Sequence, residues 1–165
     1  MRKRFILLLC AGTILPAFLG CGVDTQAVLD APDAVVVYSI DGNDYDPPEK
    51  RPKTAEEFHG YPVLGKVEIA DSAARLELVG ALKEAIIDGG GAKCFWPRHG
   101  VRVARGGQWV DYVICFFCDN VDIYTSSSGA RYKEMHVKKP LKPVLNKVLT
   151  DAGVPLAPEP FPPSP

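Results

Sequence analysis

The sequence has no apolar run long enough to cross a bilayer as a helix. Its longest candidate, residues 5–19, is interrupted by Gly12, Thr13 and Pro16, whereas a spanning helix needs about 20 consecutive apolar residues. No later segment comes closer to that length. These lengths exclude an ordinary transmembrane helix from the interpretation of the sequence.

Familiar catalytic motifs are also missing. The chain has no His-Glu-x-x-His pair, no Gly-x-Ser-x-Gly elbow, no phosphate-binding glycine loop and no internal repeat. Asp41, Asp44 and Asp46 lack the spacing of an EF-hand calcium loop. These absences disfavour familiar hydrolase, nucleotide-binding and calcium-binding chemistry. We therefore expect a non-enzymatic protein without a cofactor, while an enzyme of unfamiliar type stays open.

Neither sign of charge is in large excess. The chain has 19 Lys and Arg against 20 Asp and Glu, and three of the basic residues lie within residues 1–20. The remaining chain has a net charge near −4, which disfavours non-specific binding to nucleic acid. A locally basic stretch near the C-terminus is typical of a solvated face, although on a tethered protein it would lie within reach of anionic lipid headgroups. Its members are Arg131, Lys133, Lys138, Lys139, Lys142 and Lys147.

The N-terminus has the pattern of an export signal. Three basic residues at positions 2–4 precede the apolar run, as in a secretory signal peptide. The next residues, Phe18-Leu19-Gly20-Cys21, resemble the lipobox of bacterial lipoproteins, with Phe18 in place of the usual leucine. The resemblance implies lipidation of Cys21 and anchoring to a membrane in the cell envelope, facing the periplasm or the exterior. An ordinary cleaved signal, with Cys21 as a spare thiol, is the alternative.

Composition divides the chain into four parts. Residues 1–20 are the expected signal peptide, residues 21–32 a tether, residues 33–154 one globular domain, and residues 155–165, with six prolines, an extended tail. For the domain we predict an α+β fold with an antiparallel sheet of about five strands and two packing helices.

Hydrophobic patterns place the elements that precede the cysteine-rich region. The β-branched run 34–40 and the weakly alternating run 61–70 predict strands. The polar stretch 41–60 between them predicts a long loop with a helical turn at 54–58. A helix is expected to begin at a cap on Asp71 or Ser72 and to end at the glycines 89–91.

The region from Val101 to Tyr124 has the clearest strand pattern. A turn at Gly106-Gly107 sets a hairpin in which paired residue numbers sum to 213. This register places Val103 opposite Val110 on one face and the opposite charges of Arg102 and Asp111 together on the other.

Further elements follow this hairpin. A second tight turn at 119–120 leads to the strand 121–124, and residues 113, 115 and 117 are apolar, so we expect the middle strand to be central and covered by a helix. A last helix is predicted from Pro140 to Asp151, with Gly153 as its stop.

The hairpin also predicts a cluster of cysteine and histidine residues. Continuing the ladder beyond Gly100 brings Cys94 beside Cys118 and places His99 opposite Ile114. The proline at position 97 has no N–H, so the ladder is expected to weaken there.

We weigh three interpretations of this cluster. The first is a disulfide between Cys94 and Cys118, with Cys115 buried as a small apolar residue. The second is a tetrahedral zinc site of Cys94, His99, Cys115 and Cys118, although residues 115 and 118 point to opposite faces of a straight strand. The third is a reactive thiol–disulfide pair in the Cys-x-x-Cys motif of Cys115 and Cys118, which has only Arg98 and His99 as nearby cations. His59 and His136 are isolated and are predicted to lie on the surface.

This region resembles a family of bacterial proteins with no assigned activity, which have a Cys-Phe-x-Pro-Arg-His-Gly segment followed by a Val-Ile-Cys-Phe-x-Cys strand. The likeness extends from about Val63 to Pro155. It rests on Cys94, Phe95, Pro97, Arg98, His99, Gly100, Asp111, Ile114, Cys115, Phe116 and Cys118. It implies no reaction.

The leading functional hypothesis is therefore a lipid-anchored envelope protein, a structural or interaction module with a disulfide-stabilised sheet. The alternative is a zinc-binding protein or a thiol-based enzyme that uses the cluster.

Overall fold

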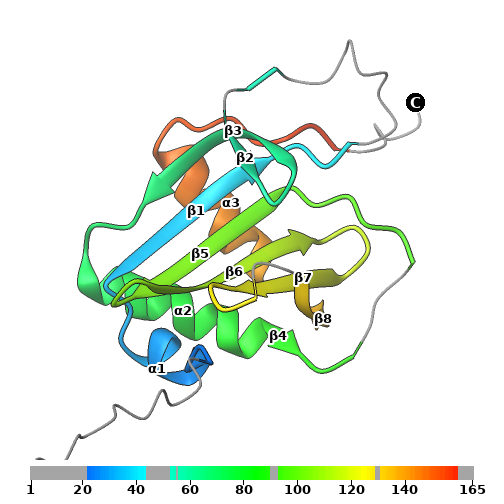
Figure 1. Ribbon diagram of the computed structural model, residues 1–165. Helices are drawn as coiled ribbons and strands as arrows, with labels where there is room; N and C mark the ends of the chain where they lie inside the picture. Colours follow the sequence, from blue (N-terminus) through cyan, green and yellow to red (C-terminus); the bar gives the residue numbers. More distant parts are fainter. Residues whose placement is uncertain (1–21, 44–52, 55, 90–92, 129–130, 160–165) are drawn as a thin grey trace, which may run out of the picture.

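The computed structural model describes residues 22–43, 53–54, 56–89, 93–128 and 131–159, which form one antiparallel sheet and three helices (Figure 1). The helices are α1 (Thr25–Asp30), α2 (Ser72–Ala85) and α3 (Leu141–Asp151). The strands are β1 (Ala34–Ile40), β2 (Glu57–Phe58), β3 (Tyr61–Glu68), β4 (Ile86–Ile87), β5 (His99–Arg105), β6 (Gln108–Cys115), β7 (Asn120–Thr125) and β8 (Arg131–Val137). Their order across the sheet is β2-β3-β1-β5-β6-β7-β8-β4.

The mixed helix-and-sheet class with an antiparallel sheet is confirmed, but the predicted number of strands is wrong. The sheet has eight strands where about five were expected. Two of the additional strands, β2 and β4, have only two residues each, which is too short for an alternating hydrophobic pattern. The third, β8, has the sequence RYKEMHV and lacks the β-branched run that marks a strand.

The three helices lie on one face of the sheet, behind it in Figure 1. Val28 of α1, Leu82 of α2 and Leu145 of α3 are each no more than 1 % exposed and belong to one core with the inward residues of β1, β5 and β6. Burying such side chains stabilises the fold by roughly 1.5–3 kcal/mol each. This face is the main core.

Helix α1 corrects the expected tether. Residues 25–30 form a helix whose Val28 is buried in the main core, and Asp24 accepts a hydrogen bond from the N–H of Ala27 as its cap. The packed domain therefore begins before residue 33. The expected signal peptide and Cys21 fall on residues 1–21, outside the described residues.

The other predicted helices are present. Helix α2 begins at Ser72, with the Asp71 side chain accepting from the N–H of Ala74, and its chain continues directly into β4. Helix α3 begins at Leu141 and is followed by Gly153 in the left-handed region at φ 72°. No helix in the described part of the chain is long and apolar enough to cross a membrane.

The predicted hairpin register is confirmed. Strands β5 and β6 pair Val103 with Val110 and Arg102 with Asp111. Gly106 and Gly107 make the turn with positive φ values of 56° and 80°, which glycine adopts without a steric penalty.

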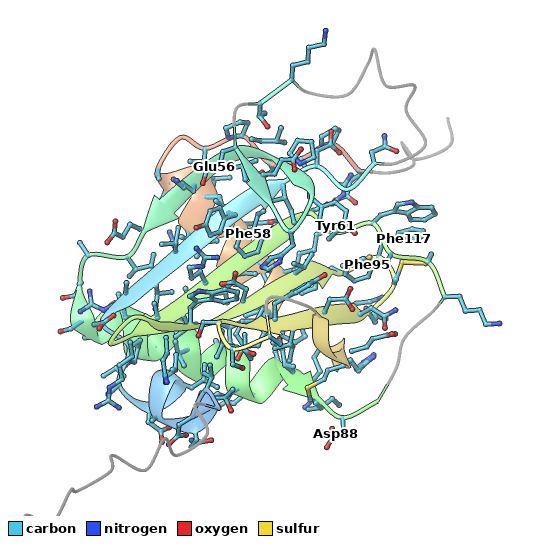
Figure 2. All side chains as sticks on the ribbon, viewed as in Figure 1. Glu56, Phe58, Tyr61, Asp88, Phe95 and Phe117 are labelled. Carbon is cyan, nitrogen blue, oxygen red and sulfur yellow. A yellow bond between two sulfur atoms is a disulfide. The ribbon has the colours of Figure 1, made fainter. Side chains whose placement is uncertain are left out.

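Strand β6 is central and is covered by a helix on one face, as expected, because α1 packs on it. The opposite face of the sheet is covered by the β2–β3 hairpin. Phe58 of β2 stacks on Tyr38 of β1, with ring centroids 4.3 Å apart, and lies over the near face of the sheet in Figure 2. A Cβ atom on Gly100 would lie 2.7 Å from the Phe58 ring, so only glycine allows this close packing. The expected helical turn at 54–58 is wrong, since Glu57 and Phe58 are a strand.

Candidate functional site

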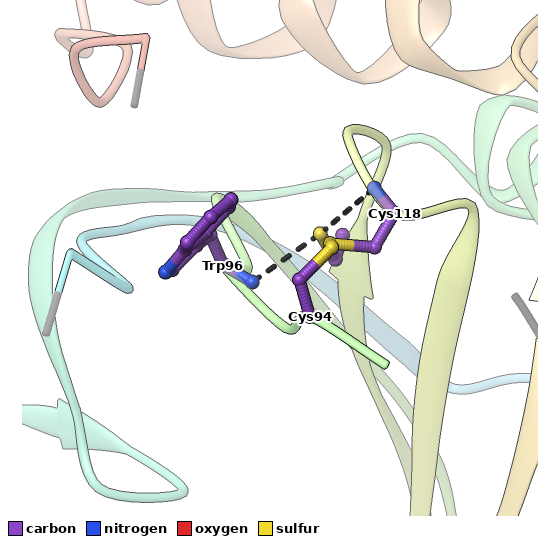
Figure 3. Close-up of a disulfide and its surroundings, with 4 residues drawn as sticks. Cys94, Trp96 and Cys118 are labelled. Carbon is purple, nitrogen blue, oxygen red and sulfur yellow. Dashed lines mark hydrogen bonds between the residues drawn. A yellow bond between two sulfur atoms is a disulfide. The ribbon is translucent and has the colours of Figure 1, made fainter. Parts of the chain in front are cut away.

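The cysteines form a disulfide between Cys94 and Cys118 (Figure 3). Cys94 precedes β5 and Cys118 lies in the turn after β6, and their Cα atoms are 6.0 Å apart. Cys115 is fully buried and unbonded, and its Sγ accepts from the backbone N–H groups of Trp96 and Cys118 at 3.3 Å each. This is the first of the three arrangements expected from the sequence.

The four residues of the hypothetical zinc site do not come together. Cys94 and Cys118 are bonded to each other, and His99 lies opposite Ile114 on the helix-covered face of the sheet. The described residues contain no group of three His, Cys, Asp or Glu side chains that would hold a metal ion. The bonded pair also differs from the Cys115–Cys118 pair on which the redox interpretation rested.

A cavity opens beside this cross-linked end of the sheet, between the start of β5 and the start of α3. Its volume is about 320 Å³. We call it the cationic cavity, and it is lined by Arg98, His99, Phe116, Phe117, Lys139, Lys142 and Glu159. Arg98 and His99 come from the Cys-Phe-x-Pro-Arg-His-Gly segment, so His99, which was considered as a zinc ligand, helps to line a cavity instead.

His99 is only 3 % exposed and is held by α3. Its Nε2 lies 2.7 Å from the side-chain oxygen of Asn146. Because that oxygen only accepts, Nε2 carries the ring proton and Nδ1 has a lone pair. Nδ1 is buried and has no hydrogen-bond partner among the described residues.

The ring of His99 is neutral over the physiological range. Burial lowers its pKa to about 4, against the opposing effect of the hydrogen bond that Nε2 donates to Asn146, and the nearby cations Lys142 and Arg98 lower it further. A neutral imidazole with a bare nitrogen accepts a hydrogen bond but does not contribute positive charge.

The C-terminal segment places a carboxylate in the cationic cavity. Glu159 lies 3.3 Å from Nη1 of Arg98 and 3.0 Å from Nζ of Lys142, through its two different oxygens. The hydrogen bond from Lys142 lowers the pKa of Glu159, and Arg98 adds to this effect. Arg98 also donates to the carbonyl of Ala157 at 3.2 Å. Residues 157–159 of the expected tail therefore contact the domain.

A second polar group lies on the opposite face of the sheet. Asp111 is fully buried and accepts from Arg102 through both carboxylate oxygens, at 2.8 and 2.6 Å. His59 Nε2 lies 2.7 Å from the same carboxylate, and its ring stacks on Tyr124 at 3.8 Å. Arg102 also lies over the Trp109 ring, 4.8 Å from its centroid. Both oxygens of the buried carboxylate thus accept a hydrogen bond from Arg102, and one of them also contacts His59.

His59 was wrongly predicted to be a surface residue. Its side chain is 14 % exposed, and its backbone has a positive φ of 52° in the turn between β2 and β3. The His59-Gly60 pair, in which both residues have positive φ, is typical of a tight hairpin turn, and this was the sequence signal that could have located it. His136 of β8 is half-buried.

Other candidates are placed separately. The Asp41 side chain accepts from the N–H of Asn43, while Asp44 and Asp46 lie outside the described residues. In the basic stretch, Lys142 belongs to the cationic cavity and Lys147 pairs with Asp151 on the surface. Nothing in the sequence pointed to Glu159 as a contact of Arg98, because 61 positions separate them in the chain and no periodicity relates them.

Comparison of the chain with models of protein families, with curated proteins and with solved structures found no match.

Proposed function

We propose that the protein is exported, anchored to a membrane of the cell envelope by lipid on Cys21, and acts there as a non-enzymatic interaction module. The observation that carries the proposal is the Cys94–Cys118 disulfide. Disulfides persist in oxidising compartments such as the periplasm and the cell exterior and are rare in the cytosol. The disulfide and the lipoprotein-like signal therefore both support a location outside the cytosol, in the cell envelope.

Binding rather than catalysis is supported by the polar groups that the domain presents. The Arg102–Asp111–His59 group has donors on both carboxylate oxygens, and Asp111 itself is 0 % exposed. This group therefore stabilises the fold and does not present a free carboxylate to a ligand. The cationic cavity instead offers positive charge, which attracts an anionic ligand, and a neutral imidazole, which accepts a hydrogen bond.

Anchoring is tested by metabolic labelling with an alkyne fatty acid in a bacterial host. We expect the wild-type protein to incorporate the label and to sediment with membranes. The Cys21→Ser variant is expected to lose both properties, while Cys115→Ser, which keeps the signal intact, is the matched control. Unlabelled wild-type protein in the soluble cytosolic fraction would contradict the proposal.

The state of the thiols gives an independent check. One thiol, that of Cys115, should react with maleimide after unfolding without reductant, and three after unfolding with reductant, in addition to any unlipidated Cys21. Three reactive thiols without reductant, in protein isolated from the envelope, would show that the disulfide that supports export is absent.

A further inference from the structure

We propose that the cationic cavity binds the C-terminal end of a peptide chain, and that Glu159 occupies its carboxylate position until such a ligand displaces it. This inference deepens the proposed interaction function and rests on it, because it names a ligand class for that module. It is argued from charge, from one unsatisfied nitrogen and from the apolar rim.

The charge arrangement selects a carboxylate. Arg98 from the segment before β5 and Lys142 from α3 approach the two oxygens of Glu159 from separate elements, at 3.3 and 3.0 Å. The Arg98 side chain is 12 % exposed, whereas that of Glu159 is 56 % exposed. Arg98 is therefore built into the domain, Lys142 is 37 % exposed at its edge, and the carboxylate enters from the solvent side. An ion pair this exposed contributes only about 0–1 kcal/mol, so a competing ligand is able to replace it.

The described residues of the tail do not donate a hydrogen bond to Nδ1 of His99. This atom is buried, bears a lone pair and has no partner among the described residues, although Glu159 is in place. An unsatisfied buried acceptor costs roughly 1–3 kcal/mol. Glu159 is flanked by Pro158 and Pro160, neither of which has an N–H to offer. The tail satisfies the cations and leaves the imidazole unsatisfied.

The last residue of a peptide supplies both missing features. It has a carboxylate, and its own amide N–H is attached to the same Cα atom. A carboxylate held by Arg98 and Lys142 would lie in the cavity that His99 also lines. Nδ1 is covered while the tail is in place, so the adjacent N–H would donate to Nδ1 after the tail has left. A simple anion has the charge without this adjacent N–H.

The rim of the cavity indicates an apolar side chain on that residue. Phe117 is 53 % exposed and stands at the end of the sheet in Figure 2, and Phe116 forms the wall beside His99, with ring centroids 5.3 Å apart. Covering exposed aromatic surface stabilises a complex by about 25 cal/mol per Å² of apolar area buried.

The test uses the full-length protein and three acetyl-Ala-Ala-Phe probes. These are the free acid, the C-terminal amide, which removes the charge, and the acid with N-methylphenylalanine, which removes the N–H. We measure Kd by NMR titration for the wild type and for Glu159→Gln. Because the tethered carboxylate competes with a contact free energy of about 0–1 kcal/mol, the acid should bind Glu159→Gln about two- to sixfold tighter than the wild type.

The probes and control variants separate the contributions. The amide should show no saturable binding, and the N-methyl acid should bind about tenfold or more weakly than the acid, because the site's acceptor is then left unpaired. Adding Lys142→Gln to Glu159→Gln should abolish binding. Lys147→Gln, on the same helix but paired with Asp151 outside the cavity, should leave it unchanged.

An NMR titration of the wild-type protein tests the same proposal without a variant that could fail to fold. The free acid should shift the amide resonances of Ala157 and Glu159 toward those of a released tail, and the amide probe should not. Equal binding of acid and amide, or no binding to a folded Glu159→Gln protein, would overturn the proposal. Lipidation at Cys21 is measured separately in cells, so a failed titration leaves the anchoring proposal standing and a failed labelling leaves the cavity proposal standing.

Discussion

Each face of the sheet buries a polar side chain, on the neighbouring strands β5 and β6. The two side chains differ in how completely they are hydrogen-bonded. Asp111, under the β2–β3 hairpin, accepts from Arg102 through two oxygens and contacts His59. His99, under α3, has one ring nitrogen paired with Asn146 and the other without a partner in the described part of the chain. A satisfied buried group holds a fold together, whereas an unsatisfied one is a feature that a ligand can complete.

The largest effect should come from breaking the satisfied group. Arg102→Leu leaves the buried Asp111 carboxylate without its ion pair to Arg102, while the contact with His59 remains. Removing one member of a buried ion pair costs about 3–5 kcal/mol, and we expect a loss of unfolding free energy near the lower end, because Arg102 is partly exposed and His59 remains. Urea melts measure it.

The control for this prediction is Lys147→Leu, which breaks an exposed pair on α3 worth about 0.3–0.5 kcal/mol. Equally small losses of unfolding free energy in both variants would show that the Arg102–Asp111 pair does not stabilise the fold. The proposed difference between the two faces would then be wrong.

The disulfide should stabilise the end of the sheet that holds the cationic cavity. Cys94 and Cys118 are separated by 24 positions, and closing a loop of this size contributes about 3 kcal/mol. Cys94→Ser should therefore lower the unfolding free energy by about this amount and should make the remaining stability insensitive to reductant.

Hydrogen exchange locates the effect of that loss. Amides near Phe116 and Phe117 should exchange faster in Cys94→Ser, while those beside Asp111 keep their protection. Cys115→Ala, which leaves the cross-link intact, should retain the reductant sensitivity of the wild type. Uniform loss of protection over both faces would mean that the disulfide does not act locally.

Acid should weaken the helix-covered face through His99. Burial lowers the pKa of His99 to about 4 in the folded protein, below the unfolded value of about 6.5, so the unfolded chain binds the proton more strongly between these values. The stability contributed by the neutral ring is complete above pH 6.5 and is lost as the pH falls toward 4.

The wild type and His99→Gln are compared by urea melts at several pH values. Between pH 6 and pH 5 the wild type should lose about 1 kcal/mol more than the variant, since one pH unit corresponds to at most about 1.4 kcal/mol per proton. Parallel profiles would show that the ring is not held neutral.

The smallest effect on stability is expected at the rim of the cavity. Phe117 is 53 % exposed, so Phe117→Ser should change the unfolding free energy by no more than about 0.5 kcal/mol. The same substitution should weaken binding of the acetyl-Ala-Ala-Phe acid. A large loss of stability with unchanged binding would place Phe117 in the core and not in a ligand site.

Much of the fold was predictable where local patterns are strong. The strand 34–40, the helix capped at Asp71, and the hairpin register from Gly106-Gly107 all follow from short-range rules of propensity and turn geometry. The pairing of Cys94 with Cys118 followed from extending that register. Each of these features depends on neighbours in the chain or on one turn.

The elements that were missed have weak local signals. Helix α1 has six residues and only one buried side chain, Val28, so its stability comes from packing on β5 and β6. Strands β2 and β4 exist because longer strands, β3 and β8, offer them free edges. Hydrophobic periodicity over two residues contains no information about such pairing.

The sequence by itself determined the hairpin, its opposed Arg102 and Asp111, and the neighbouring thiols, because backbone pairing from a defined turn propagates residue by residue. Only the tertiary structure decided that His59 reaches Asp111 and that Asn146 and Glu159 meet the Arg98-His99 pair. Those contacts join segments tens of residues apart, and they depend on how a hairpin, a helix and a tail pack on the sheet. No local rule encodes that packing.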